Sequence, residues 1–341
     1  MTRKWLALIL ALVGSSAWAQ GQLYNADITA QTSISNPARA IKTAEGQWLA
    51  FSLPALDGTR SPCCWKGSWN KSGEPGCNLK TSDRSFGTRS DSPLSSELIV
   101  YSEVRNGEVQ SLRLVGEQCP VNGEGAKVTW IGNVDDKAGM DWLEQVAGKD
   151  DIGSGDKSAL YALALHRNPK AGKRLYSLAS DTRGDLSEEA IFWLGEARGQ
   201  DGFNWLQQLL AELPKGDRRR EINFALAQND SKEAAELLLE IAQSDTDSEQ
   251  RSEAMFWLAQ SYPKQAEGWL KQLVYVEQDE DVLEQAIFAI SQLPGDSGSQ
   301  ILLDLARDSA INRDARRQAL FWLAQSDDDK TIAALTELLT R

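Results

Sequence analysis

Four cysteines give this chain its clearest capacity for covalent chemistry. Cys63 and Cys64 are adjacent, Cys77 follows them in a polar stretch, and Cys119 ends a predicted strand. An even number of cysteines in a chain that leaves the cytoplasm indicates disulfides. Neighbouring cysteines seldom bond each other, because the small ring distorts the peptide between them. We therefore expect one residue of the adjacent pair to bond to Cys77 and the other to Cys119, and the spacing leaves open which goes where.

Two alternatives stay open for the same cysteines. A four-cysteine zinc site would use them as thiolate ligands, although the usual Cys-x-x-Cys spacing is absent. A redox-active or nucleophilic thiol at Cys63 or Cys64 would need a stabilised thiolate, and the neighbouring Lys66 gives only slight support for one. Under the disulfide interpretation, closing a loop of about 15 residues adds roughly 3 kcal/mol of stability to a segment too polar to pack by itself.

Other groups that could carry chemistry are sparse. His166 is the only histidine, which leaves no His-rich metal site and no redundancy for a Ser-His-Asp triad. The sequence has no phosphate-binding glycine motif, which argues against a nucleotide cofactor. Acidic runs such as Asp279-Glu280-Asp281 are typical of solvated helix starts and do not indicate a carboxylate-pair hydrolase. We expect no cofactor, no metal and no catalytic residue, so the sequence favours a protein that is not an enzyme.

The first 20 residues have the pattern of an export signal. A basic start, Arg3 and Lys4, precedes a short apolar run, and Ala17-Trp18-Ala19 supplies a signal-peptidase site. The run is too short for a stable anchor, so an uncleaved membrane helix is the less favoured alternative. We predict a signal peptide over residues 1–19, a mature chain beginning at Gln20, and a periplasmic or secreted protein.

The acidity of the chain limits its partners. The formal net charge of −13 becomes −15 when Arg3 and Lys4 are removed with the signal. A protein of this charge repels phosphate backbones, which argues against nucleic acid. No later segment approaches the roughly 18 consecutive apolar residues of a membrane span, so we expect no membrane insertion after cleavage.

A short apolar phrase recurs through the second half of the chain. It reads ALYALAL, AIFWLGE, INFALAQ, AMFWLAQ, AIFAISQ and ALFWLAQ, beginning at Ala159, Ala190, Ile222, Ala254, Ala286 and Ala319. The spacing is 31 to 33 residues, the third position is always aromatic, and each unit contains a second apolar helix pattern after a polar break. Such a period is typical of stacked helical arrays. We predict six helical pairs in a right-handed α-solenoid over residues 158–341, which makes the fold class mainly α.

This second half resembles the HEAT-repeat proteins, in the short bacterial form called lyase-like HEAT repeats. The resemblance is carried by the recurring phrase and by an arginine three residues before it, at Arg219, Arg251 and Arg316. It implies that these arginines bond acidic residues of adjacent turns, with ligand binding as the alternative. It also implies a binding scaffold rather than a particular reaction.

The fourth position of the phrase alternates between small and large residues. Trp193, Trp257 and Trp322 occupy it in every second unit, and alanine occupies it in the others. The alternation predicts that each tryptophan fills space left by an alanine of a neighbouring helix. Loss of a tryptophan buried in this way would cost about 3–5 kcal/mol. The alternative is an aromatic platform for a glycan or peptide.

Residues 20–148 have no helical period and predict a small β-rich domain with the cysteine loop. Alternating residues indicate strands in EGQWLAFSLP, SELIVYSEV, VQSLRLVGEQCPV and AKVTWIGNV, and Asn106-Gly107 indicates a hairpin turn between two of them. The sequence from Asp136 predicts a helix. The polar, glycine-bearing segment 149–157 predicts the linker to the repeats.

These features together favour an exported protein–protein interaction scaffold that binds a partner on the solenoid surface. The Cys-Cys-Trp loop ahead of helical repeats also resembles exported bacterial proteins associated with cell-envelope signalling. The alternative function is a thiol-redox or other enzyme that uses Cys63 or Cys64. A bilin lyase is less favoured, because the lyases behind that repeat name work inside the cell.

Overall fold

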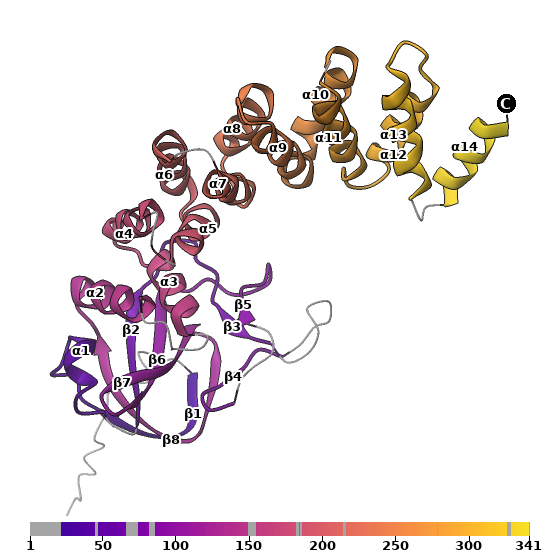
Figure 1. Ribbon diagram of the computed structural model, residues 1–341. Helices are drawn as coiled ribbons and strands as arrows, with labels where there is room; N and C mark the ends of the chain where they lie inside the picture. The colour runs from indigo at the N-terminus through magenta and orange to yellow at the C-terminus, as the bar shows by residue number, and fades with distance from the viewer. Residues whose placement is uncertain are drawn as a thin grey trace, which may run out of the picture. The chain divides into compact units, whose positions relative to one another are not determined.

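The computed structural model describes residues 22–340 except 45–46, 66–73, 82–85, 149–154, 182–183, 185, 214–215, 278 and 326–328. The chain forms two compact units that divide after Pro169 (Figure 1). The predicted signal peptide, Gln20 and most of the predicted linker lie outside the described residues. No described helix has both the length and the apolar character needed to cross a bilayer.

A mixed β-sheet forms the first unit. Its strands run in the order β1-β8-β2-β6-β7, with β4 paired to β8. Their bounds are β1 (Gln22–Ala30), β2 (Gln47–Pro54), β4 (Cys77–Asn78), β6 (Glu97–Arg105), β7 (Glu108–Gly116) and β8 (Pro120–Asn133). A separate small pair joins β3 (Cys63–Cys64) to β5 (Phe86–Gly87). The unit also contains α1 (Pro37–Ala40), α2 (Asp136–Ala147) and α3 (Gly155–Leu165).

The predicted hairpin is confirmed at β6 and β7. Asn106 and Gly107 form its turn with positive φ angles of 53° and 73°, the backbone that a tight two-residue hairpin requires. The predicted strands of β2 and β8 and the predicted helix α2 are confirmed as well.

Different layers cover the two faces of this sheet. Phe51 of β2 meets Trp142 of α2 edge-on, with ring centroids 5.3 Å apart, so α2 covers one face. On the other face, the four cysteines form one buried cluster with β-strand residues that include Tyr101 and Trp130. The long cysteine loop therefore covers this face of the sheet, as a second layer of helices does in other folds.

The helix α3 belongs to the first unit, although the sequence assigns it to the first repeat. It contacts α2 and β7, and its C-terminal end bonds to the sheet through Leu56 N–H to Leu165 O at 2.8 Å and Arg167 N–H to Pro54 O at 2.9 Å. The aromatic residue of its repeat phrase, Tyr161, packs on Phe86 beside the cysteine loop.

The second unit is a succession of helices (Figure 1). They are α4 (Pro169–Ser180), α5 (Ser187–Ala197), α6 (Gly199–Glu212), α7 (Asp217–Ala227), α8 (Lys232–Ser244), α9 (Ser248–Ser261), α10 (Pro263–Val276), α11 (Glu280–Ser291), α12 (Ser297–Arg307), α13 (Arg313–Ala324) and α14 (Asp329–Thr340). Side-chain caps from Ser231, Asp247, Asp279 and Asn312 begin α8, α9, α11 and α13. From α5 onward each helix contacts the next one, and the odd-numbered helices α5 to α13 also contact one another in a row.

Small residues set the close approach of the two helices within a pair. The first turn of each even-numbered helix from α4 to α12 carries a buried small residue, at Ala171, Gly202, Ala234, Ala266 and Gly298. A Cβ at Gly202 would lie 1.9 Å from Leu194 O, and one at Gly298 would lie 2.4 Å from Ile290 O. These glycines let the backbones of α5 and α6, and of α11 and α12, nearly touch.

Candidate functional site

The cysteine cluster is the first candidate, and its sulfur atoms lie at disulfide distance. Cys63 is bonded to Cys119, and Cys64 is bonded to Cys77. The two disulfides are neighbours, since the Sγ atoms of Cys77 and Cys119 lie 3.8 Å apart. The connectivity that the sequence left open is thus Cys63 to Cys119 and Cys64 to Cys77. Cys77 lies in β4, and Cys119 lies in the turn between β7 and β8 and does not end a strand as predicted.

The chemistry of the cluster follows from this bonding. All four cysteines lie in the described part of the chain, and none has a free thiol. Three of the sulfur atoms, on Cys63, Cys77 and Cys119, lie within 4.8 Å of one another, but a disulfide sulfur is not the thiolate that zinc requires. Each cysteine is also at most 3% exposed. The cluster as it stands fastens the loop to the sheet, and Lys66 lies outside the described residues.

A ladder of aromatic rings crosses the second unit and is the second candidate. We call it the aromatic ridge, and its members are Phe192 and Trp193 on α5, Phe224 on α7, Phe256 and Trp257 on α9, Phe288 on α11, and Phe321 and Trp322 on α13. Each ring contacts the next one in the ladder, with centroids 4.7 to 5.9 Å apart. The ridge therefore connects five helices without interruption.

The ring geometry repeats every two helical pairs. Phe256 stacks on Phe288 with an interplanar angle of 6°, and Phe192 stacks on Phe224 at 21°. Trp257 then leans back onto Phe224, with centroids 4.7 Å apart. The residue after Phe224 is the fully buried Ala225, whose small side chain does not compete for this space. The alternation of alanine and tryptophan thus corresponds to two kinds of ring contact.

The ridge lies at the boundary between core and solvent. Trp193, Trp257 and Trp322 are half-buried rather than fully buried, and so are the phenylalanines apart from the last. Phe321, at the end of the ridge, is 52% exposed. The structure places the tryptophans where they both pack against rings and reach the surface, so packing and recognition are both open to them.

Carboxylates border the ridge on one side. The indole N–H of Trp193 donates to Glu189 at 3.1 Å, and that of Trp257 donates to Glu253 at 3.3 Å. Partial burial raises the pKa of the Glu253 carboxyl, although the hydrogen bond from Trp257 and the charge of Arg220 act in the opposite direction. At Trp322 the corresponding residue is Gln318, and within the described residues the indole nitrogen has no acceptor.

A row of polar side chains, four amides and one carboxylate, follows the ridge phenylalanines on their C-terminal side. Four residues after each ridge phenylalanine the sequence has Glu196, Gln228, Gln260, Gln292 and Gln325. Gln260 and Gln325 are exposed, and Gln260 Nε2 donates across the helix boundary to Gln292 O at 3.3 Å. The sequence analysis did not identify this row, although each of its residues is the seventh residue of the recurring phrase.

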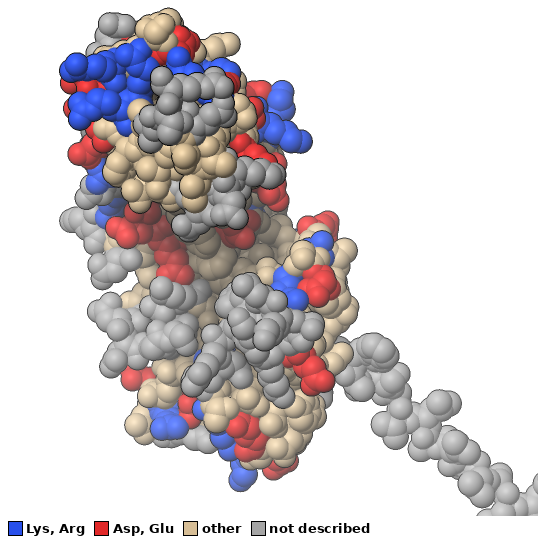
Figure 2. All heavy atoms as spheres, turned by 90° about the vertical axis from the view of Figure 1, so that its right-hand side faces the viewer, with Lys and Arg blue, Asp and Glu red and all other residues tan. Residues whose placement is uncertain are grey.

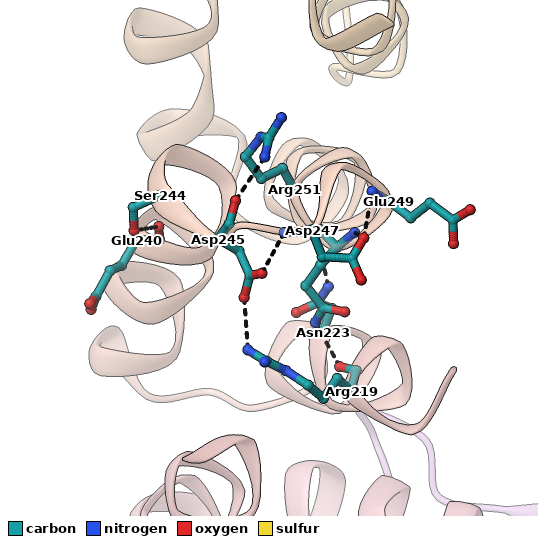
Figure 3. Close-up of polar contacts among 9 residues, drawn as sticks. Arg219, Asn223, Glu240, Ser244, Asp245, Asp247, Glu249 and Arg251 are labelled. Carbon is teal, nitrogen blue, oxygen red and sulfur yellow. Dashed lines mark hydrogen bonds and ion pairs between the residues drawn. The ribbon is translucent and has the colours of Figure 1, made fainter. Parts of the chain in front are cut away.

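The repeat arginines bind turns between helices, and Figure 3 shows this for Arg219 and Arg251. Arg219 donates to the carboxylate of Asp245, in the turn between α8 and α9, at 2.7 Å. Arg251 donates to the main-chain oxygen of the same residue at 2.8 Å, and Arg316 donates to Asp308 O at 3.3 Å. Only Arg219 bonds an acidic side chain in these contacts, and all three hold backbone turns in place.

A groove of about 450 Å³ lies between α11 and α13 at the exposed end of the ridge. It is lined by Glu280, Leu283, Glu284, Ile287, Asn312, Asp314, Ala315, Arg317, Gln318 and Phe321. Figure 2 shows that charged side chains of both signs gather on this end of the second unit. The groove has an apolar floor and charged walls, which is the arrangement of a side-chain binding site.

Comparisons with known proteins add little to this description. No protein-family model matches the chain, and no curated protein matches it either. Among solved structures, human deoxyhypusine hydroxylase in complex with glycerol, a HEAT-repeat protein, is 16% identical. That match covers 58% of this chain and 88% of that chain, with a TM-score of 0.26. The fold defines a mainly helical protein with a strand-rich N-terminal unit.

Proposed function

We propose that this protein is an exported scaffold that binds a partner protein along the aromatic ridge. In this proposal residues 158–341 form an α-solenoid of HEAT-like helical pairs. The recurring phrase and the row of contacts among the odd-numbered helices support it. The observation that carries the proposal is the ridge itself. Aromatic rings that reach solvent on five neighbouring odd-numbered helices form a continuous exposed apolar surface, which is typical of a binding site.

The ligand that fits the ridge best is an extended segment of a protein. Sugars bind aromatic side chains through the ring faces, but Phe192 stacks on Phe224 and Phe256 stacks on Phe288, which covers one face of each ring. Their edges are left for apolar side chains of a ligand, and the bordering amides can bond its backbone. Packed helices lie roughly 8–10 Å apart, so the ridge spans about 35 Å, which a segment of about ten extended residues would cover.

Export to the cell envelope is part of the proposal. The predicted signal peptide supports it, and so do the two disulfides, which persist in oxidising compartments. The mass of the mature N-terminus, measured on protein from a periplasmic fraction, tests this part. Recovery of intact chain beginning at Met1 from the cytosol would end it.

The thiol enzyme remains the second candidate function, carried only by the adjacent cysteines. It requires reduction of the disulfide at Cys63 or Cys64, and both cysteines of each disulfide are buried. Alkylation of the folded protein under mild reducing conditions separates the two functions, because an enzyme must expose a thiol there. We expect no cysteine to be labelled, whereas rapid labelling of either residue would favour the enzyme.

Partner capture tests the scaffold with a matched pair of variants. Phe321→Ser removes an exposed ridge ring, and Val276→Ser removes a side chain that is 70% exposed at the end of α10. Both variants should fold, because neither side chain is in the core. The parent and Val276→Ser should cross-link to the same envelope protein, and Phe321→Ser should lose it. Equal capture by all three would contradict the proposal.

A further inference from the structure

The groove between α11 and α13 combines an apolar floor with uncompensated negative charge. Leu283, Ile287 and Ala315 on its floor are at most 5% exposed, and the exposed ring of Phe321 forms one side. A floor of this kind takes the methylene stem of a long side chain. The volume of about 450 Å³ is within the roughly 300–1,000 Å³ of small ligand sites, so one side chain fits easily.

The charges of the groove determine which terminal group that side chain carries. Glu280 and Glu284 are exposed on the same face of α11, four residues apart, and no ion pair involves either of them in the described part of the chain. Asp314, on α13, is already paired with Arg317 at 3.1 Å. Three carboxylates and one guanidinium leave the groove with two unmatched negative charges.

We propose that this groove binds an arginine side chain of the partner segment. This inference rests on the proposed function and names the residue that anchors the segment at one end of the ridge. The guanidinium lies between the carboxylates of Glu280 and Glu284 and against the Phe321 ring, and its stem covers the apolar floor. Arginine is preferred to lysine, because its planar group stacks on an aromatic ring and bonds a carboxylate in a bidentate manner.

The spacing of the helices suggests the backbone conformation of the segment. A polyproline II helix advances about 9.3 Å in its three-residue turn, which matches the roughly 8–10 Å between packed helices. A segment in this conformation presents every third side chain to successive helices of the ridge. This match defines a probe that needs no knowledge of the natural partner.

The probe is a fluorescent peptide made of three Pro-Pro-Arg repeats, compared with peptides that have glutamine or glutamate in place of arginine. Fluorescence anisotropy with the mature chain should show binding of the arginine peptide that weakens as salt rises from about 50 to about 500 mM. Binding of the glutamine and glutamate peptides should be at least about tenfold weaker. Equal affinity for the arginine and glutamine peptides would overturn the inference.

Three variants locate the binding. Glu280→Gln/Glu284→Gln and Phe321→Ser should each weaken the arginine peptide about tenfold. Glu233→Gln/Glu240→Gln, which removes the same charge from exposed positions of α8, should leave its affinity unchanged. A loss common to both double variants would show a general charge effect and overturn the groove. If Phe321→Ser loses the captured partner while the peptides show no arginine preference, only this inference fails. If Phe321→Ser still captures the partner, the proposed function fails.

Discussion

The residues of the ridge contribute to stability and reach the surface at the same time. Trp257 contacts Phe224 on one neighbouring helix and Phe256 on its own, yet part of its ring reaches solvent. Replacing such a residue by alanine removes its ring contacts, but the cavity that is left is open to water. The free energy of unfolding should therefore fall by less than when a fully buried tryptophan is replaced.

Trp257→Ala tests this intermediate position. We expect a loss of about 2–3 kcal/mol in the free energy of unfolding, measured by urea denaturation, against the 3–5 kcal/mol of a fully buried aromatic residue. Phe321→Ala, at the exposed end of the ridge, should cost less than about 1 kcal/mol. A loss at Trp257 below 1 kcal/mol would mean that the ridge has no packing role.

Glu253 makes the stability of the ridge depend on pH. Because burial raises the pKa of this carboxyl in the folded state, its contribution is fully present below the unfolded pKa near 4.5 and is lost as the pH rises through the folded pKa. Glu253→Gln keeps an acceptor for Trp257 and removes the charge. The variant should be more stable than the parent at pH 7 by up to about 0.5 kcal/mol, with the difference vanishing near pH 4.

Denaturation at several pH values gives this comparison. Glu249→Gln is the control, since Glu249 also pairs with Arg220 but does not bond an indole. It should not stabilise the protein at pH 7. A Glu253→Gln variant that is less stable than the parent at pH 7 would contradict the account.

At the scale of elements, backbone contact decides where helices can approach. A Cβ at Gly195, in α5, would lie 2.1 Å from Ala225 O in α7, so this glycine sets the distance between two ridge helices. Gly268, in α10, has nothing within 4 Å of the same position. Both glycines lie in helices, so alanine improves the helix propensity at either position. The two positions differ in whether the added Cβ collides with a neighbouring helix.

Alanine substitution at these glycines separates packing from propensity. Gly195→Ala should destabilise the protein by about 1–3 kcal/mol, because α5 and α7 must move apart. Gly268→Ala should be neutral or stabilising by up to about 1 kcal/mol. Thermal unfolding of both proteins beside the parent provides the measurement, and similar effects from the two changes would refute the close approach.

Local patterns predicted those elements that have a strong period or a specific turn. The recurring phrase predicted the helices from α3 onward, and Asn106-Gly107 predicted the hairpin. The polar segment of β1 gave no such signal. It is mostly exposed, and it is a strand because it pairs along its length with β8. The two-residue strands at Cys63 and Cys77 are likewise fixed by disulfides and partner strands, which a local sequence pattern does not contain.

The candidate site shows the same division. The aromatic and tryptophan positions were evident from the repeat, but the ring ladder depends on how successive helices pack. Likewise, Leu283 and Phe321 meet in one groove only because α11 and α13 are neighbours. The membership of α3 in the first unit was also hidden, because its sequence matches the repeat while its contacts are with the sheet.

At the scale of the whole molecule, the two units rely on different sources of stability. The first has a sheet with one face covered by a disulfide-bonded loop, and the second has helices that pack on their neighbours. Loss of the Cys63–Cys119 disulfide should therefore act on the first unit. Removing a native disulfide from a small domain typically costs about 2–5 kcal/mol.

Hydrogen exchange of Cys63→Ser/Cys119→Ser measures this separation. Amides of β6 and β8 should lose protection, whereas those of α9 and α11 should keep it. Equal loss in the two units would show that they unfold together.

Site-specific photo-cross-linking in living cells of the source organism tests the central claim, that the ridge face binds a partner, most directly. A photoreactive phenylalanine analogue at Phe321 places the reactive group at the groove, and the same analogue at Val276 places it at the exposed end of α10. We predict one discrete cross-linked protein from the first position and none from the second, with the cross-linked peptide containing arginine. The same products from both positions, or none from Phe321, would contradict the account.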